Sequence, residues 1–291
     1  MHEHLSEHDV ATPVDSILVS RSANEMPYQF PITSENIPAT IEDHTVTDLE
    51  WRESPLVAAP VTAFPVPHTE VRTTPIVERD NLEVLHVGCG VYARGKLPPV
   101  FHDTGWREIR LDIDPDVHPD YIASITDMRV ISDARVDAVY SSHNIEHLYP
   151  HEVLLALREM CRVMKPSGFA FIKVPDLQEV ARHVADGKLD DTLYISPMGP
   201  IAPLDILFGH RSSLEAGNAF MAHRTGFTGG TLGAALINAG FAAALVQRDP
   251  SAFCLDAVAF RTSPGTEEVV RVQARMLSSP DRSAVLYTPA R

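Results

Sequence analysis

The feature that most constrains the fold is an alternation of short apolar runs with segments of helical periodicity, which begins at residue 82. Apolar runs of roughly four to eight residues are typical of buried parallel strands, whereas apolar residues three or four positions apart mark one face of a helix. Val153, Leu157 and Met160 have the helical spacing, so we expect a helix over 150–164. We expect strands over 82–87, 108–113, 136–141, 169–174, 241–247 and 252–261.

This order predicts an α/β fold with a doubly wound, mostly parallel sheet. The last two apolar runs are separated only by 248–251, which is short enough for a terminal antiparallel hairpin. The domain is expected to cover 81–262. Within it, 175–227 contains prolines at 197, 200 and 203 and no clear strand, and an insertion of this length beside a sheet is typical of a functional lid. Residues 263–291 are expected to be a C-terminal tail.

Residues 1–80 are expected to be an acidic, proline-rich N-terminal extension. They contain nine prolines and no glycine, and 14 acidic residues against four arginines. Proline blocks helices and disfavours central strands. Two interpretations stay open, namely extended pieces that pack on the main domain and a disordered arm.

Charge and hydropathy exclude several classes of partner. The net charge of −15 repels phosphate backbones, so we expect no nucleic-acid binding. No apolar run approaches the roughly 18 residues of a membrane span, and the start MHEHLSEHDV lacks the features of a secretory signal. The three cysteines have no metal-binding spacing. These observations favour a cytoplasmic protein without membrane contact, and nothing in the sequence indicates its oligomeric state.

Acidic residues and glycines at the ends of the expected strands indicate a nucleoside-containing ligand. In VLHVGCG, Gly88 allows a tight turn and Gly90 lets backbone N–H groups approach a ligand. Asp112 ends the next strand, where a carboxylate can accept hydrogen bonds from both ribose hydroxyls. Asp127 lies in a later loop, where its carboxylate can accept a hydrogen bond from an adenine amino group.

A resemblance to a known family rests on five segments in a fixed order, which are VLHVGCG, RLDIDP, SITDM, VDAVYSSHNIEHL and CRVMKPSGFAFIKVPD. Over about 82–262 the chain resembles the class I S-adenosylmethionine-dependent methyltransferases, most closely the branch with an IEHL or LEHL signature. The resemblance implies a seven-stranded sheet, S-adenosylmethionine as cofactor and methylation of an acceptor, for which a small molecule is the default. The cofactor-binding residues that it implies are Gly88, Cys89, Gly90, Asp112, Asp127, Met128 and Ser142.

The glycine turn departs from the family pattern. His86 stands where an acidic residue is usual, Tyr92 stands where a third glycine is expected, and the prolines at 98–99 leave room for little more than one helical turn. A shortened helix weakens the N-terminus that would otherwise face the cofactor carboxylate. Arg94 or Lys96 could substitute for it by direct charge pairing.

The candidate catalytic residues are histidines. Methyl transfer requires a positioned acceptor, and a base only if the acceptor must lose a proton. We expect His143 to be the first candidate for this base and His223 the second. His143, Glu146 and His147 have the H-x-x-E-H spacing of some zinc peptidases, but Pro150 breaks the segment. We therefore predict no metal ligands, although a divalent ion on this group and a purely structural role both stay open.

Two other functions also stay open. The glycine turn and Asp112 could serve a nicotinamide dinucleotide, although the later glycine of that pattern is missing. The domain could also be a non-catalytic binding module whose altered turn no longer holds a cofactor. Release of S-adenosylhomocysteine would distinguish a methyltransferase from both.

Overall fold

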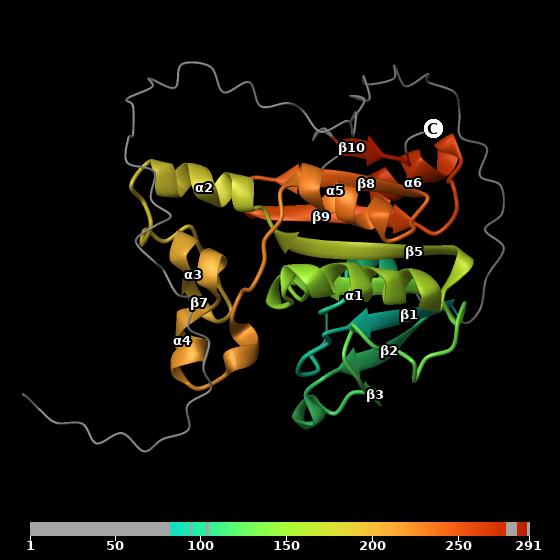
Figure 1. Cartoon of the computed structure of the whole chain (residues 1–291), viewed down its shortest axis with the longest axis horizontal. Coiled ribbons are helices and arrows are strands. Elements are labelled where there is room, and N and C mark those ends of the chain that lie inside the picture. Colours follow the sequence, from blue (N-terminus) through green and yellow to red (C-terminus); the bar gives the residue numbers. More distant parts are fainter. Residues whose placement is uncertain (1–81, 94, 103–104, 278–283, 290–291) are drawn as a thin grey trace, which may run out of the picture. The chain divides into compact units, whose positions relative to one another are not determined.

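The computed structural model describes residues 82–93, 95–102, 105–277 and 284–289. The extension expected over 1–80 lies outside these residues. Within the described residues the main sheet has eight strands, one more than the expected seven. They are β1 (Leu82–Val87), β2 (Trp106–Asp112), β3 (Tyr121–Ile122), β4 (Val136–Ser142), β5 (Met164–Pro175), β8 (Ala243–Asp249), β9 (Cys254–Phe260) and β10 (Ala284–Tyr287). Figure 1 shows this sheet with helices packed across it.

The strand order is β10-β8-β9-β5-β4-β1-β2-β3. Strands β3, β2, β1, β4 and β5 are parallel, and β9, β8 and β10 are antiparallel to their neighbours. The predicted doubly wound sheet with a terminal hairpin, here β8 and β9, is confirmed. The sequence did not predict β10, because four residues after a long polar segment are too few to show the alternation of a strand. The expected tail over 263–291 therefore contains an edge strand and the helix α6 (Thr266–Met276).

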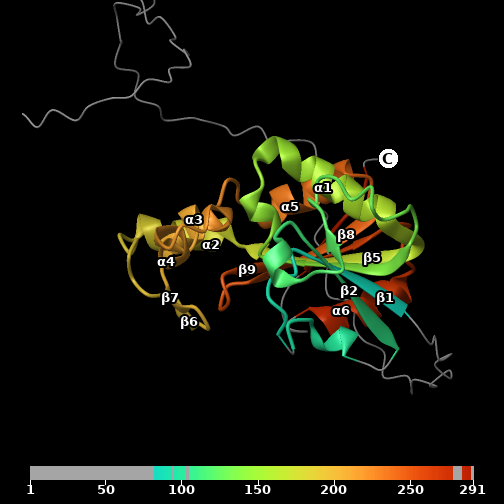
Figure 2. The same cartoon turned by 90° about the horizontal axis from the view of Figure 1, so that it is seen from below.

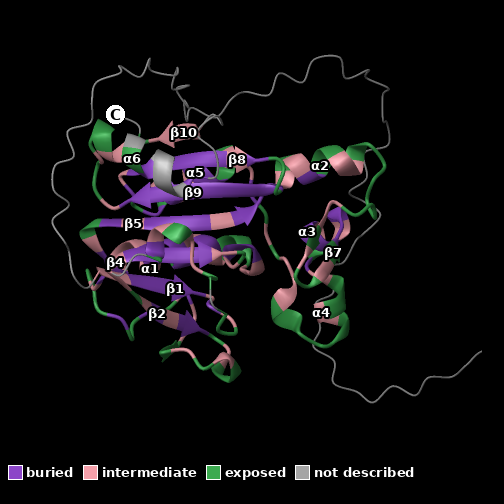
Figure 3. Cartoon of the chain, turned by 180° about the vertical axis from the view of Figure 1, so that it is seen from behind, coloured by how far each residue is buried: buried purple, intermediate pink, exposed green. Residues whose placement is uncertain are grey.

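Helices cover both faces of the sheet (Figure 2). On one face α1 (Pro150–Val163) and α5 (Gly229–Asn238) pack against the larger apolar cluster, which includes Leu157 and Leu232. On the other face the 3-10 helix η2 (Pro99–Phe101) and α6 contribute Phe101 and Val272 to a second cluster. The central strands are thus buried on both sides (Figure 3), which explains their nearly continuous apolar sequences.

Helix α1, which the sequence predicts over 150–164, and helix α5 both begin at residues that favour a helix start. Helix α1 starts at Pro150, a favourable first residue, and the Glu152 carboxylate accepts a hydrogen bond from the Tyr149 N–H at 2.8 Å. Thr228 caps α5 by accepting a hydrogen bond from the Thr231 N–H at 3.3 Å. Within the described residues, no helix combines the length and the apolar character that a membrane crossing needs.

The chain between β5 and α5 forms the insertion. It contains α2 (Leu177–Ala185), the hairpin β6 (Tyr194–Ser196) and β7 (Gly199–Ile201), α3 (Pro203–Phe208), α4 (Arg211–Glu215) and the 3-10 helix η5 (Ala219–Met221). The sequence gave no sign of β6 and β7, because three residues are too few for a strand pattern. The insertion has its own small core of Val180, Ile201 and Ile206, which also takes in Phe253 from the β8–β9 loop.

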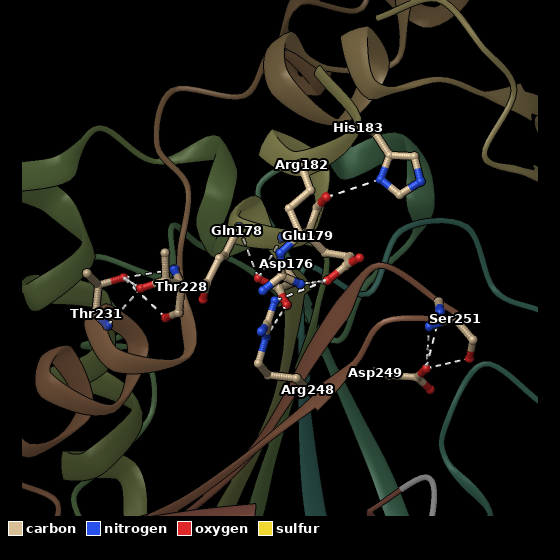
Figure 4. Close-up of polar contacts among 11 residues, drawn as sticks. Asp176, Gln178, Glu179, Arg182, His183, Thr228, Thr231, Arg248, Asp249 and Ser251 are labelled. Carbon is tan, nitrogen blue, oxygen red and sulfur yellow. Dashed lines mark hydrogen bonds and ion pairs between the residues drawn. The ribbon is translucent and has the colours of Figure 1, made fainter. Parts of the chain in front are cut away.

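Charged side chains fix the start of the insertion to the sheet. The Arg248 guanidinium lies 2.6 Å from the Asp176 carboxylate and 3.3 Å from the Glu179 carboxylate, as Figure 4 shows. Asp176 is fully buried, and its other carboxylate oxygen caps α2 by accepting from the Gln178 N–H at 3.0 Å. A buried carboxylate with a cation and a helix N-terminus as partners has its charge compensated.

Candidate functional site

The glycine turn follows β1 and requires glycine at both predicted positions. Gly88 and Gly90 have φ values of +62° and +57°, a region that side chains disfavour. A Cβ atom at Gly88 would lie 2.5 Å from the Asn144 side chain, and one at Gly90 would lie 2.9 Å from the Lys96 Nζ. The turn is therefore packed closely against the segment that follows β4 (Val136–Ser142).

Asp112 joins the glycine turn, as the sequence predicts. The Gly90 N–H donates to the Asp112 carboxylate at 2.7 Å, and the Asp114 N–H donates to its other oxygen at 3.0 Å. Val87 and Leu111 are neighbours in the sheet, so the two strands end side by side. Each carboxylate oxygen keeps a lone pair. Asp112 is thus held where a ribose could bind beside the backbone of the turn.

Two cations bind the carbonyl groups of the turn. The Lys96 Nζ donates to the Cys89 carbonyl at 2.8 Å, and the Arg110 guanidinium donates to the Gly90 carbonyl. Arg94, the other predicted cation, lies outside the described residues. Burial raises the pKa of the Cys89 thiol to about 11, so this group stays protonated at neutral pH. The contact of Cys89 with Lys96 is made through its backbone carbonyl.

His86 has a carboxylate partner from the neighbouring strand. Its Nδ1 lies 2.6 Å from Glu108 Oε1, and its buried ring lies 5.1 Å from the Tyr140 ring between centroids. In the family that the sequence resembles, an acidic residue is usual at the position of His86. In the structure, Glu108 of β2 brings an acidic group to the same place.

The residues predicted for adenine are already engaged. The Asp127 carboxylate forms two hydrogen bonds of 2.7 Å with the Arg129 guanidinium, which lower the pKa of Asp127. The Met128 N–H donates to the Glu159 carboxylate at 2.7 Å, and the Met128 side chain is buried in the core. Each Asp127 oxygen keeps a lone pair for an adenine amino group, whereas an adenine contact with the Met128 N–H would require Glu159 to give way.

Ser142 and His143 lie at the C-terminal end of β4, as predicted. Ser142 is the last residue of the strand, and the His143 backbone has a φ of +48°, which turns the chain sharply. The His143 Nδ1 lies 3.4 Å from Glu146 Oε1, and its Nε2 lies 3.8 Å from the Cys254 thiol. Burial by itself would lower the pKa of His143, but the contacts with Cys254 and Glu146 outweigh burial and raise it.

The insertion brings His223 to Glu146 and His147, which the sequence did not predict. One ligand-type atom from each of these three residues lies within 4.8 Å of the other two. The His147 and His223 rings are in contact, with 4.8 Å between their centroids and 67° between their planes. The signal available in the sequence was the repeated His-Arg dipeptide within the insertion, at 210–211 and 223–224.

The two arginines of these dipeptides have structural partners. Arg224 lies over the Tyr149 ring at 4.9 Å and donates to the His147 carbonyl at 3.2 Å. Arg211 forms hydrogen bonds of 2.9 Å and 3.1 Å with the Asp205 carboxylate inside the insertion. Both arginines therefore already have partners within the protein.

Comparison with known proteins identifies the central part of the chain. Residues 85–172 match the model of a family described as "Methyltransferase domain". This region contains the glycine turn, Asp112, Ser142 and His143, whereas the insertion lies outside it. No curated protein matches the chain in sequence.

Solved structures resemble the chain at low identity. A 1,6-didemethyltoxoflavin-N1-methyltransferase from Burkholderia thailandensis is 17% identical, with 63% of this chain and 72% of that chain covered and a TM-score of 0.40. An S-adenosylmethionine-dependent methyltransferase from Archaeoglobus fulgidus is 19% identical, with coverages of 73% and 88% and a TM-score of 0.38. One from Aquifex aeolicus is 16% identical, with coverages of 62% and 83% and a TM-score of 0.39.

Proposed function

We propose that this class I S-adenosylmethionine-dependent methyltransferase acts on a small-molecule acceptor, which binds between the end of β4 and the insertion. The observation that carries the proposal is the hydrogen bond of 2.7 Å between Gly90 and Asp112. It joins a glycine turn and a carboxylate at the C-terminal ends of adjacent parallel strands, which is where open α/β sheets bind nucleosides.

The residues present fit the cofactor. Gly90 offers a backbone that no Cβ shields, and both Asp112 oxygens can accept from ribose hydroxyls. Bound S-adenosylmethionine supplies a methyl group on a sulfonium sulfur, ready for in-line displacement. The protein then has to hold the acceptor at attack distance, and this positioning accounts for most of its catalytic contribution.

The acceptor side supports a small molecule. The net charge of −15 opposes binding of nucleic acids, and the insertion packs its His223 against the segment that follows β4. The half-exposed ring of His143 lies at this edge, with its Nδ1 3.4 Å from Glu146 Oε1. Because its pKa is raised, His143 is protonated at neutral pH, where it could orient an anionic acceptor oxygen; it would serve as the predicted base only after losing this proton. His223 stays the second candidate, because its pKa is lowered by burial and its ring is therefore neutral at neutral pH.

The proposal includes a location in the cytoplasm. Cys89, Cys161 and Cys254 are all free thiols, which agrees with a reducing compartment such as the cytoplasm.

The alternative of a non-catalytic binding module predicts cofactor binding without product release on any acceptor. The alternative of a nicotinamide-dependent oxidoreductase predicts binding of NAD in place of S-adenosylhomocysteine.

Calorimetric titration of the purified chain with S-adenosylhomocysteine tests the cofactor site. Asp112→Asn should weaken binding by at least about tenfold, because hydrogen bonds to a charged group contribute about 1.5–3 kcal/mol. Asp114→Asn is the matched control, since this neighbouring carboxylate caps a 3-10 helix by accepting from the Asp116 N–H. Equal effects of the two substitutions, or no binding by the folded wild-type chain, would contradict the proposed site. A screen of acceptors for S-adenosylhomocysteine release then tests turnover.

A further inference from the structure

Three polar side chains meet between the end of β4 and the insertion, outside the residues that the cofactor site uses. Glu146 and His147 lie in the 3-10 helix η4 (Ile145–His147), and His223 comes from the last part of the insertion. Among the described residues, this is the group with the geometry to hold a metal ion, since its ligand atoms lie within 4.8 Å of one another. Chain segments about 75 residues apart thus converge on one point.

The hydrogen bonds of both histidines leave the same nitrogen open. The His147 Nδ1 lies 3.1 Å from the Ala222 carbonyl oxygen, and the His223 Nδ1 lies 2.6 Å from the Ile206 carbonyl oxygen. A carbonyl oxygen only accepts hydrogen bonds, so each Nδ1 carries the proton and each neutral ring has its lone pair on Nε2. Histidines that bind metals are oriented in this way by a backbone carbonyl on the other ring nitrogen.

Glu146 is a buried carboxylate without hydrogen bonds. Its residue is 1% exposed, and neither carboxylate oxygen has a hydrogen-bond partner. Burying a charge is costly unless the charge is paired or coordinates a metal. Its nearest cation is His143, whose Nδ1 lies 3.4 Å from Glu146 Oε1. A bound divalent ion would compensate this carboxylate more completely than one imidazolium at that distance.

The protein backbone holds the two halves of the group together. The Arg224 and Thr225 N–H groups donate to the Glu146 carbonyl at 2.9 Å and 3.1 Å, and the His223 N–H donates to the Phe208 carbonyl at 3.1 Å. Glu146 and His223 are therefore placed by hydrogen bonds that do not depend on their side chains. This preorganisation is what a metal site needs if it is to bind without refolding the chain.

We propose that Glu146, His147 and His223 form a binding site for a late first-row divalent cation, with Zn²⁺ the expected ion. Two imidazoles and one carboxylate suit Zn²⁺ or its neighbours, whereas Mg²⁺ and Ca²⁺ prefer oxygen ligands. Bond lengths of about 2.0–2.1 Å place the ligand atoms of a tetrahedral site about 3.4 Å apart. The observed upper limit of 4.8 Å therefore requires any two ligand atoms to approach each other by about 1.4 Å at most, which is within the reach of side-chain rotation.

Three protein ligands leave a fourth position open to water or to an oxygen of the acceptor. Coordination lowers the pKa of a bound hydroxyl group, so the ion would supply the activation that a base otherwise provides. In this arrangement His223 is a metal ligand and no longer a candidate base. His143 would lose Glu146 as its partner and turn to the acceptor. This last consequence rests on the proposed function, whereas metal binding itself does not.

The test is metal binding to the full chain, purified without a histidine tag and stripped of metal by a chelator. Titration with Co²⁺ should give the visible absorption of a four-coordinate site at one ion per chain, and Zn²⁺ should displace it. Glu146→Gln and His223→Ala should each weaken binding by at least about 100-fold. His183→Ala is the matched control, because the His183 Nδ1 also faces a backbone carbonyl, that of Glu179, at 3.2 Å.

Two results would overturn the proposal. One is the absence of the Co²⁺ absorption from a folded wild-type chain, and the other is binding that survives both Glu146→Gln and His223→Ala. Circular dichroism establishes that each variant is folded, and Glu146→Gln removes a buried charge without changing shape. Titration with S-adenosylhomocysteine in parallel separates the two proposals, since failure of the cofactor site would leave the Co²⁺ result intact.

Discussion

Substitution of Lys96 tests how the segment after the glycine turn binds the amino-acid end of the cofactor. The helix expected after the turn is reduced to η2, so no long helix N-terminus is available for the cofactor carboxylate. The Lys96 ammonium lies at the turn, 2.8 Å from the Cys89 carbonyl oxygen. An ammonium group has three N–H donors, so two remain for a carboxylate. We expect Lys96→Met to weaken binding of S-adenosylhomocysteine.

The magnitude follows from the exposure of Lys96. Two unit charges about 4 Å apart interact with about 1 kcal/mol in water and about 4 kcal/mol at an effective dielectric constant of 20. Lys96 is exposed, so the lower figure applies, and the affinity should fall about fivefold. The wild-type affinity should also decrease with added salt, and the affinity of the variant should respond much less.

The assay compares two ligands by calorimetry. Methylthioadenosine has the same adenosine and sulfur as S-adenosylhomocysteine but no carboxylate. Loss of charge pairing should weaken only S-adenosylhomocysteine, whereas a distorted turn should weaken both ligands equally. An equal loss for the two ligands would refute the charge-pairing argument, and so would unchanged binding of S-adenosylhomocysteine.

Three other substitutions test the architecture. Gly88→Ala should lower the free energy of unfolding by about 1–2 kcal/mol, because the backbone at this position is left-handed and the new Cβ would meet Asn144. It should also weaken cofactor binding. Thermal unfolding measures the loss of stability, and calorimetry measures the loss of affinity. Leu157→Ala should cost about 2–5 kcal/mol in denaturant unfolding, because Leu157 is fully buried in the core. Burial alone would raise the pKa of Asp205, but Arg211 outweighs burial and lowers it to about 2. This carboxylate should therefore contribute stability that is lost as the pH falls from about 4 to about 2, and Asp205→Asn should remove its share of the acid dependence, while other carboxylates with lowered pKa values, such as Asp127 and Glu159, keep theirs.

The sheet was predictable because its strands are either continuous apolar runs or end in recognisable turns. The helix α1 was predictable from apolar spacing, and α5 from Thr228 at its start. The short strands β3, β6, β7 and β10 were not, because two to four residues carry no period and depend on a neighbouring strand. Their existence is decided by tertiary contacts, which a single sequence does not display.

The candidate site, like the sheet, was predictable in part. Gly90 and Asp112 come together because both lie at the ends of adjacent parallel strands, and strand order fixes that proximity. The contacts of Asp127 and Met128 with Arg129 and Glu159 could not be predicted, because they depend on side-chain directions. The meeting of His223 with Glu146 depends on the path of the whole insertion, for which the sequence has no local signal.

The insertion leaves the sheet and returns to it at a single point. Asp176 and Phe227 form an isolated bridge, and the Leu177 N–H donates to the Phe227 carbonyl at 2.9 Å. A segment with adjoining ends can be lengthened, shortened or exchanged at little entropic cost to the rest of the fold. The insertion is therefore a unit that evolution can exchange as a whole while the strands of the sheet are inherited unchanged.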